Sequence, residues 1–187
     1  MAASDPHPLA WLRPRRLTPI TLVHGRAALG PHRDGLVEAL VGSGFAATDL
    51  PIGPADRARC LAGLVPPGGV LVRRCAAWVH TGTPRPDVVD VVLPRPRRHR
   101  PGVVRTHVAA LRDDDVEVIG GSAVTTLTAT LLDVLRWEDA DAVVLARALV
   151  AAGADPTAAA LRCEELCRHA GTARARDLLA EVQSARP

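Results

Sequence analysis

Apolar residues recur at helical spacing in the first and last thirds of the chain, whereas the middle holds short β-branched runs. Apolar positions three and four residues apart are typical of amphipathic helices, and Val-rich runs bounded by Pro or Gly are typical of strands. The pattern predicts helices over 33–45, 54–69, 73–82, 126–137, 141–152, 155–171 and 172–185. It predicts strands over 87–93 and 103–108 and, around a Gly-Gly turn, two more within 115–125. We therefore expect an α+β fold whose small mixed or antiparallel sheet, at about 85–125, is flanked by N-terminal and C-terminal helices.

End signals accompany some of the predicted helices. Asp155 is a typical N-cap residue, Pro156 suits the first helical position, and Gly171 suits the position after a helix end. The helix over 33–45 depends instead on four apolar residues that share one helical face: Leu36, Val37, Leu40 and Val41.

The strands predicted over 87–93 and 103–108 flank the sequence PRPRRHRPG, residues 94–102, which we call the basic segment. We expect the two strands to form a β-hairpin with the basic segment at its tip. Prolines stiffen the segment and remove backbone donors, so it is not expected to extend the strand ladder. Its arginines are therefore expected to project into solvent.

The candidate nucleic-acid contacts are the arginines of the basic segment and one arginine of the strand that follows: Arg95, Arg97, Arg98, Arg100 and Arg105. The planar guanidinium group suits phosphate because it donates two parallel hydrogen bonds. DNA is therefore the partner that we favour. An acidic protein partner and a solvated loop that only protects a sheet edge are the alternatives.

Charge is distributed unevenly along the chain, and all 23 basic residues are arginine. Residues 1–112 hold 16 arginines against 7 acidic residues, a net charge of +9. Residues 113–187 hold 7 arginines against 13 acidic residues, a net charge of −6. This asymmetry indicates a basic front that faces a polyanion and a more acidic rear. The use of arginine without lysine has a plainer explanation in the codons of a GC-rich genome.

We divide the chain into a basic Pro/Arg-rich arm, residues 1–34, and a single α+β domain, residues 35–187. Its apolar stretches are shorter than the ~20 residues that a bilayer crossing needs. The N-terminus lacks the hydrophobic region of a signal peptide. Four irregularly spaced cysteines are typical of reduced thiols. We therefore expect a cytoplasmic protein.

Motifs for catalysis and metal binding are weak. Nucleotidyl transfer needs two carboxylates one residue apart to hold Mg²⁺, but Asp133 is followed by leucine at position 135. Cys163, Cys167 and His169 lack the second ligand pair of a zinc site, so we expect both cysteines to be buried thiols. We expect no enzyme activity, no metal and no cofactor.

Residues 70–137 contain short motifs in a recognisable order. A helix with an Ala-Ala-x-x-His stretch precedes a strand that runs into proline, a basic loop, a strand ending in His, and a Val-Thr pair before Thr-Leu-Leu-Asp. The positions are Ala76, Ala77, His80, Pro94, His107, Val124, Thr125, Thr130, Leu131, Leu132 and Asp133. This arrangement resembles the AbiEi-type antitoxin-like family of actinobacteria, and the resemblance covers residues 65 to 185.

The resemblance implies an antitoxin-like core from a toxin–antitoxin system, DNA binding with transcription regulation, and a toxin protein as a possible partner. Family members often begin with a winged helix, and some end in a nuclease domain similar to very-short-patch repair endonucleases. Residues 1–65 do not match a winged helix cleanly, so the sequence leaves open whether they form one, and we expect no such nuclease here. Val72 and Arg73 replace the family's Ser-His, and Ala129 replaces its arginine. The resemblance leaves the roles of His80 and His107 open between structure and function.

Three functions are compatible with these observations. We favour a non-enzymatic DNA-binding regulator. A protein-interaction module that holds an acidic partner such as a toxin, without binding DNA, is the first alternative. A remnant of a nuclease-fusion protein is the second.

Overall fold

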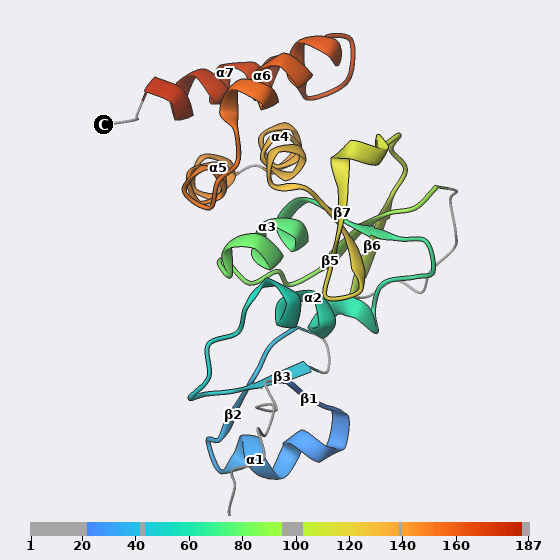
Figure 1. The fold of residues 1–187 in the computed structure, drawn as a ribbon, viewed down its shortest axis with the longest axis vertical. Helices are drawn as coiled ribbons and strands as arrows, with labels where there is room; N and C mark the ends of the chain where they lie inside the picture. The colour runs from blue at the N-terminus through green and yellow to red at the C-terminus, as the bar shows by residue number, and fades with distance from the viewer. Residues whose placement is uncertain (1–21, 42–43, 95–102, 139, 185–187) are drawn as a thin grey trace, which may run out of the picture.

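The molecule has a small N-terminal sheet, a five-stranded mixed sheet and a layer of C-terminal helices at the end opposite the N-terminal sheet (Figure 1). The computed structural model describes residues 22–41, 44–94, 103–138 and 140–184. A mixed sheet with helices before and after it confirms the predicted α+β class.

The first described residues form an antiparallel sheet with strand order β1-β3-β2. Its elements are β1 Leu22–His24, the 3₁₀ helix η2 Gly25–Ala28, α1 Leu29–Arg33, β2 Val37–Ala39 and β3 Gly44–Ala47. Because β1 pairs with β3, residues 22–33 of the predicted arm are folded together with the residues that follow. Residues 1–21 of that arm lie outside the described part of the chain.

The helix predicted over 33–45 is wrong, because this stretch contains β2 and the start of β3. Gly35 has a φ of 72°, a left-handed conformation that ends α1 and cannot continue a right-handed helix. Two more glycines follow within the stretch, which disfavours helix further. The expected single buried face is also absent, since Leu36 is 62% exposed while Val37 and Val41 are buried.

The five-stranded sheet has the order β6-β5-β4-β8-β7. Its strands are β4 Val70–Leu71, β5 Val89–Val92, β6 Val104–His107, β7 Val116–Ile119 and β8 Ser122–Thr125. The pair β7–β8 is the predicted hairpin around a Gly-Gly turn, and β4 pairs antiparallel with β5 and parallel with β8. The sequence pattern did not predict β4, although this two-residue strand lies in the centre of the sheet.

The hairpin predicted from 87–93 and 103–108 is wrong, because β5 and β6 are parallel. Their register pairs Val89 with Val104 and Val92 with His107. Eleven residues separate the two strands, whereas hairpin loops have about two to five. The longer connection lets the chain return to the start of β5 before pairing again, as parallel neighbours require. Residues 95–102 of the basic segment lie outside the described residues.

The remaining predicted helices are confirmed, but the helix predicted over 155–171 ends at Glu165, so Gly171 does not follow its end as expected. The confirmed helices are α2 Pro54–Ala62, α3 Arg73–Thr81, α4 Leu127–Trp137, α5 Ala142–Ala151, α6 Pro156–Glu165 and α7 Thr172–Ser184. The Asp155 side chain caps α6 by accepting hydrogen bonds from the N–H groups of Thr157 and Ala158. None of the helices in the described part of the chain combines the length and hydropathy needed to cross a bilayer.

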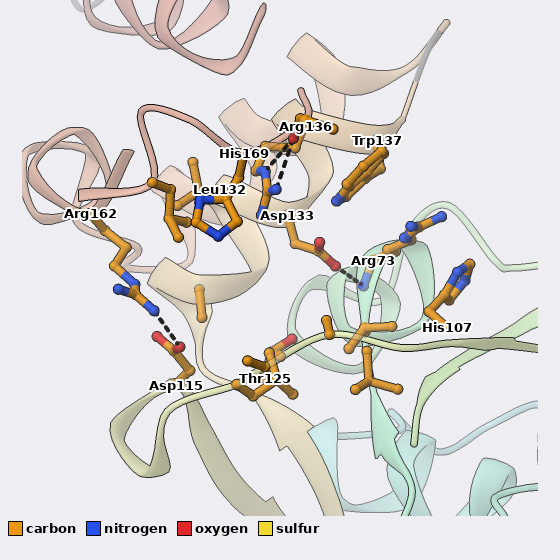
Figure 2. Close-up of a pocket in the computed structure, with 18 of the residues that line it drawn as sticks. Arg73, His107, Asp115, Thr125, Leu132, Asp133, Arg136, Trp137, Arg162 and His169 are labelled. Carbon is orange, nitrogen blue, oxygen red and sulfur yellow. Dashed lines mark hydrogen bonds and ion pairs between the residues drawn. The ribbon is translucent and has the colours of Figure 1, made fainter. Parts of the chain in front are cut away.

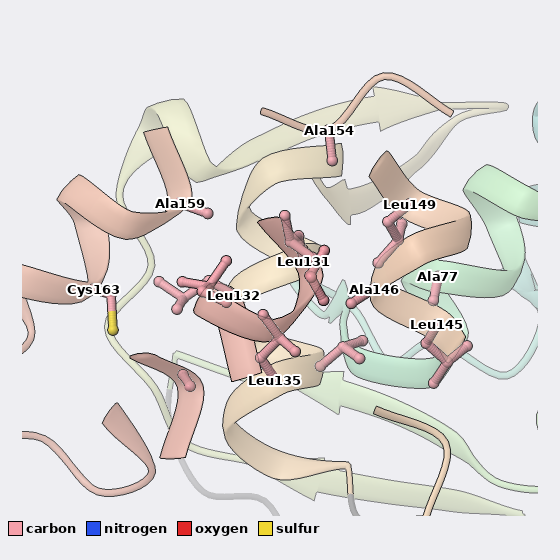
Figure 3. Packing of buried hydrophobic residues seen from close by; sticks show 14 residues of the cluster. Ala77, Leu131, Leu132, Leu135, Leu145, Ala146, Leu149, Ala154, Ala159 and Cys163 are labelled. Atoms are coloured by element: carbon pink, nitrogen blue, oxygen red, sulfur yellow. The ribbon is translucent and has the colours of Figure 1, made fainter. Parts of the chain in front are cut away.

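Two hydrophobic clusters form the core, and α3 contributes to both. The first joins α4 with the C-terminal helices and includes Ala77 of α3 (Figure 3). The second lies between α2, α3 and the five-stranded sheet and includes Trp78. Their largest fully buried aliphatic side chains include Leu61, Leu71, Leu131, Leu135, Leu145 and Leu149. Adjacent residues of α3 thus fix the helical layer against the sheet.

Candidate functional site

Of the predicted nucleic-acid contacts, only Arg105 belongs to the described residues. Arg95, Arg97, Arg98 and Arg100 lie outside them. Arg105 is on β6, the edge strand, and its side chain is 60% exposed. Its Nη1 lies 3.6 Å from Oδ1 of the buried Asp90 on β5. This pairing orients Arg105 and leaves most of its surface accessible.

Asp90 also holds His107, which is two residues beyond Arg105 on the same face of β6. The Nε2 atom of His107 lies 2.7 Å from the Asp90 carboxylate, to which it donates a hydrogen bond. One buried acid therefore positions a surface arginine and a histidine that lines a pocket.

The pocket, which has a volume of about 350 Å³, lies where the ends of β5 and β6 meet the start of α3, α4 and the turn after α6 (Figure 2). Its ionisable lining side chains are Arg73, His107, Asp115, Asp133, Arg136, Arg162 and His169. Apolar residues of α4, Val72 before α3, Val92 of β5, residues 108–111 after β6 and the turn after α6 also line it. The volume is within the range of small-ligand sites, about 300–1,000 Å³.

Asp133, on α4, is the central acid of the pocket. Its Oδ2 accepts a hydrogen bond of 3.1 Å from the backbone N–H of Arg73 (Figure 2). Burial raises the pKa of this carboxyl to about 6, although the charges of Arg73, Arg136 and His107 favour the ionised form. A carboxyl group with a strongly raised pKa in a pocket is a candidate functional group.

Arg73 begins α3 in a strained backbone conformation. It has a φ of 52°, which is unfavourable for residues that carry a Cβ. Its guanidinium lies 5.1 Å from the ring centroid of Trp137 and donates no hydrogen bond to another described residue. The strain coincides with the pocket, where the N–H of Arg73 is held by Asp133.

Arg136 also lies against the indole of Trp137, with its guanidinium 5.2 Å from the ring centroid. Its Nε and Nη2 atoms donate to the carbonyl oxygen of Ala170 over 3.2 and 2.8 Å. Burial lowers the pKa of Arg136, against the attraction of Asp133. Gly171 follows with a φ of 78°, and a Cβ there would come within 2.7 Å of the Arg136 carbonyl oxygen. The turn after α6 is thereby held closely against α4.

Arg162 lines the opposite part of the pocket, and its charge is matched by acids. Its Nη2 lies 3.2 Å from Asp115 Oδ2, and its Nη1 lies 2.8 Å from Glu165 Oε2. Arg73 and Arg136 have no such carboxylate contact within salt-bridge distance among the described residues. The unmatched positive charge of the pocket is therefore concentrated near Trp137.

His80 has a structural contact. Its Nε2 lies 2.8 Å from the backbone oxygen of Thr125 on β8, to which it donates. The Thr125 and Thr130 hydroxyls are 2.8 Å apart and buried. Of the positions that carry the family resemblance, Thr125, Leu132, Asp133 and His107 line the pocket, whereas His80 does not.

The cysteine prediction is correct for one residue and wrong for the other. Cys163 is buried and its thiol donates to the Thr172 carbonyl oxygen, whereas Cys167 is exposed. Cys167 is exposed because α6 ends at Glu165, two residues before it. No cluster of three or more His, Cys, Asp or Glu residues with metal-holding geometry occurs in the described parts of the chain.

Sequence reasoning did not single out Arg73, Arg136, Trp137 or Arg162 as site residues. One signal was visible, because Arg136 and Trp137 follow Asp133 by three and four positions and therefore share its side of α4. The contribution of Arg73 was not visible, since it depends on packing between α3 and α4 across 60 residues.

No model of a known protein family matches the chain, and no curated protein sequence matches it either. The resemblance to the AbiEi-type antitoxin-like family stays a prediction from the motif positions.

Proposed function

We propose that the protein is a non-catalytic DNA-binding regulator, antitoxin-like in role, that contacts phosphates through the basic segment and Arg105. The main support for this proposal is the position of the basic segment between β5 and β6. The basic segment, nine residues with four arginines and no acidic residue, lies within the eleven-residue connection between two neighbouring strands at the edge of the five-stranded sheet. Arg105 lies on the outermost of these strands, and its 60% exposed side chain adds a further guanidinium.

Backbone hydrogen bonds fix the described residues on both sides of the segment. The N–H of Leu93 donates to the carbonyl of His107 over 3.0 Å, and the N–H of Val89 donates to the carbonyl of Val103 over 2.6 Å. Because β5 and β6 are parallel, these anchors lie at opposite ends of the strand pair. A segment anchored at both ends has less freedom to lose on binding than a free tail has.

Charge supports DNA as the partner. The first 112 residues carry a net charge of +9 and the remainder a net charge of −6. This separation favours binding to a polyanion on one side of the molecule. Guanidinium groups contact phosphate oxygens regardless of base sequence, so the basic segment supplies affinity and position rather than base recognition.

A fluorescence anisotropy titration with a labelled DNA duplex at low salt tests this proposal. The variant carries Arg97→Ala, Arg98→Ala and Arg100→Ala. The loss of three charged contacts is expected to weaken binding on the order of 100-fold, at about 1 kcal/mol per contact.

The matched control removes three exposed arginines from the acidic part of the chain: Arg147→Ala, Arg168→Ala and Arg176→Ala. It changes the net charge equally and is expected to bind DNA nearly as the wild type does. Equal losses in both variants would contradict a specific role of the basic segment. If the wild type binds an acidic protein partner but no DNA, the protein-interaction alternative replaces the proposal.

A further inference from the structure

We propose that the pocket beside Trp137 binds a small phosphate monoester that carries hydroxyl groups, the chemistry of a sugar phosphate or a nucleoside monophosphate. This inference goes beyond DNA binding, because it uses residues of α3 and α4 and none of the basic segment.

Cationic donors outnumber carboxylates beside Trp137. The guanidinium groups of Arg73 and Arg136 both lie against the indole of Trp137, at 5.1 and 5.2 Å from its centroid. Arg73 donates no guanidinium hydrogen bond to a described residue, and Arg136 uses two donors on one backbone carbonyl. Asp133 is the acid near both arginines. Two cations against one carboxylate leave a positive site with free donors, which suits a phosphate dianion.

Asp133 also has one carboxylate oxygen left to accept a hydrogen bond. Oδ2 of Asp133 takes the N–H of Arg73, while Oδ1 accepts no hydrogen bond from another described residue. A carboxylate beside a phosphate is repulsive unless the ligand also donates a hydrogen bond to it. A ligand hydroxyl satisfies Oδ1 and makes this arrangement favourable. The ligand chemistry is therefore a phosphate together with hydroxyl groups, rather than a phosphate alone.

The size and lining of the pocket also suit such a ligand. A volume of about 350 Å³ accommodates more than a phosphate group. Trp137 is 39% exposed, and Val72 and Leu132 add apolar surface to the lining. His107, whose ring is oriented by Asp90, provides a second polar group at the sheet side. An apolar wall with a few convergent polar groups is typical of small-ligand sites.

Isothermal titration calorimetry on the full chain, with AMP, ribose 5-phosphate and adenosine as separate ligands, tests the proposal. AMP or ribose 5-phosphate is expected to bind with one site per chain, and adenosine at least about tenfold more weakly because it lacks the charged group. Stronger binding of AMP than of ribose 5-phosphate identifies nucleotides as the preferred class, and equal binding identifies sugar phosphates. Failure of both to saturate the protein at millimolar concentration, or adenosine binding as tightly as AMP, would overturn the proposal.

Arg73→Gly is the informative variant, because glycine accepts the positive φ while removing the guanidinium. It is expected to weaken phosphate-ligand binding at least about tenfold, with an unchanged circular dichroism spectrum. The Arg97, Arg98, Arg100 triple variant should retain the ligand affinity of the wild type. Wild-type ligand affinity in Arg73→Gly would contradict the assignment. This crossed pair separates the ligand site from DNA binding, since each variant is expected to lose only one of the two activities.

Discussion

Ionisation of the Asp133 carboxyl lowers the stability of the folded protein, and a single substitution should reveal this loss. Burial raises the pKa of this carboxyl from 3.8 to about 6, against the opposing effects of Arg73 from α3, Arg136 from α4 and His107 from β6. Asp133→Asn removes the charge and keeps an oxygen that can accept the hydrogen bond from the N–H of Arg73. The substitution therefore isolates the cost of ionisation.

The magnitude follows from the two pKa values. At pH values between these two pKa values, Asp133 is protonated in the folded protein and ionised in the unfolded chain. The stability contributed by this group therefore falls as pH rises from about 4 to 6. The full loss is roughly 3 kcal/mol above pH 7. About half of that loss is already present at pH 5, so the advantage of Asp133→Asn should grow by roughly 1.5 kcal/mol between pH 5 and pH 8. Any pH-independent difference in stability between the protein with protonated Asp133 and the Asp133→Asn variant cancels when the two pH values are compared.

Urea unfolding followed by circular dichroism at pH 5, 6, 7 and 8 measures the effect for both proteins. Asp177→Asn, at an exposed position of α7, removes the same charge outside the pocket and is expected to show no growing advantage. If the free energies of unfolding of the wild type and Asp133→Asn change in parallel with pH, ionisation of Asp133 does not destabilise the folded protein.

Two further predictions concern backbone strain and thiol exposure. The variant Arg73→Gly should be about 1 kcal/mol more stable than Arg73→Ala, because alanine retains the steric penalty of a φ of 52°. Equal urea midpoints for the two variants would contradict this. Cys163→Ala should cost about 1–2 kcal/mol of stability because the thiol is buried, whereas Cys167→Ala should stay within about 0.5 kcal/mol. A thiol reagent should label Cys167 before Cys163 in the native protein, and the reverse order would contradict the exposure of Cys167.

The helices could largely be predicted because their apolar periodicity and end signals are local. Asp155 and Pro156 define the start of α6, and both residues act there as expected. The strand β4 was missed because two residues are too few to show a period. The helix prediction over 33–45 failed for another reason. The spacing of Val37 and Val41 fits one face of a helix and also fits a strand followed by a turn. Gly35, Gly42 and Gly44 disfavour the helix, and pairing with β3 selects the strand.

The direction of β6 could not be obtained from residue types. Valine runs indicate strands but carry no information on whether neighbours are parallel, and the length of the connection was the available signal. The pocket was harder still to predict from the sequence. Asp133 and Arg136 are close in sequence, but the contact between Asp133 and the backbone of Arg73 exists only after α3 packs against α4.

The salt dependence of DNA binding is the strongest test of whether the basic segment contacts phosphates. Each phosphate neutralised contributes about −0.9 to the slope of log affinity against log salt concentration. We expect a steep slope for the wild type, and a slope flatter by roughly two to three for the variant with alanine at 97, 98 and 100. We also expect an unchanged slope for the Arg147, Arg168, Arg176 control. A wild type that binds no DNA at low salt, or a basic-segment variant with the wild-type slope, would contradict phosphate contact by the basic segment.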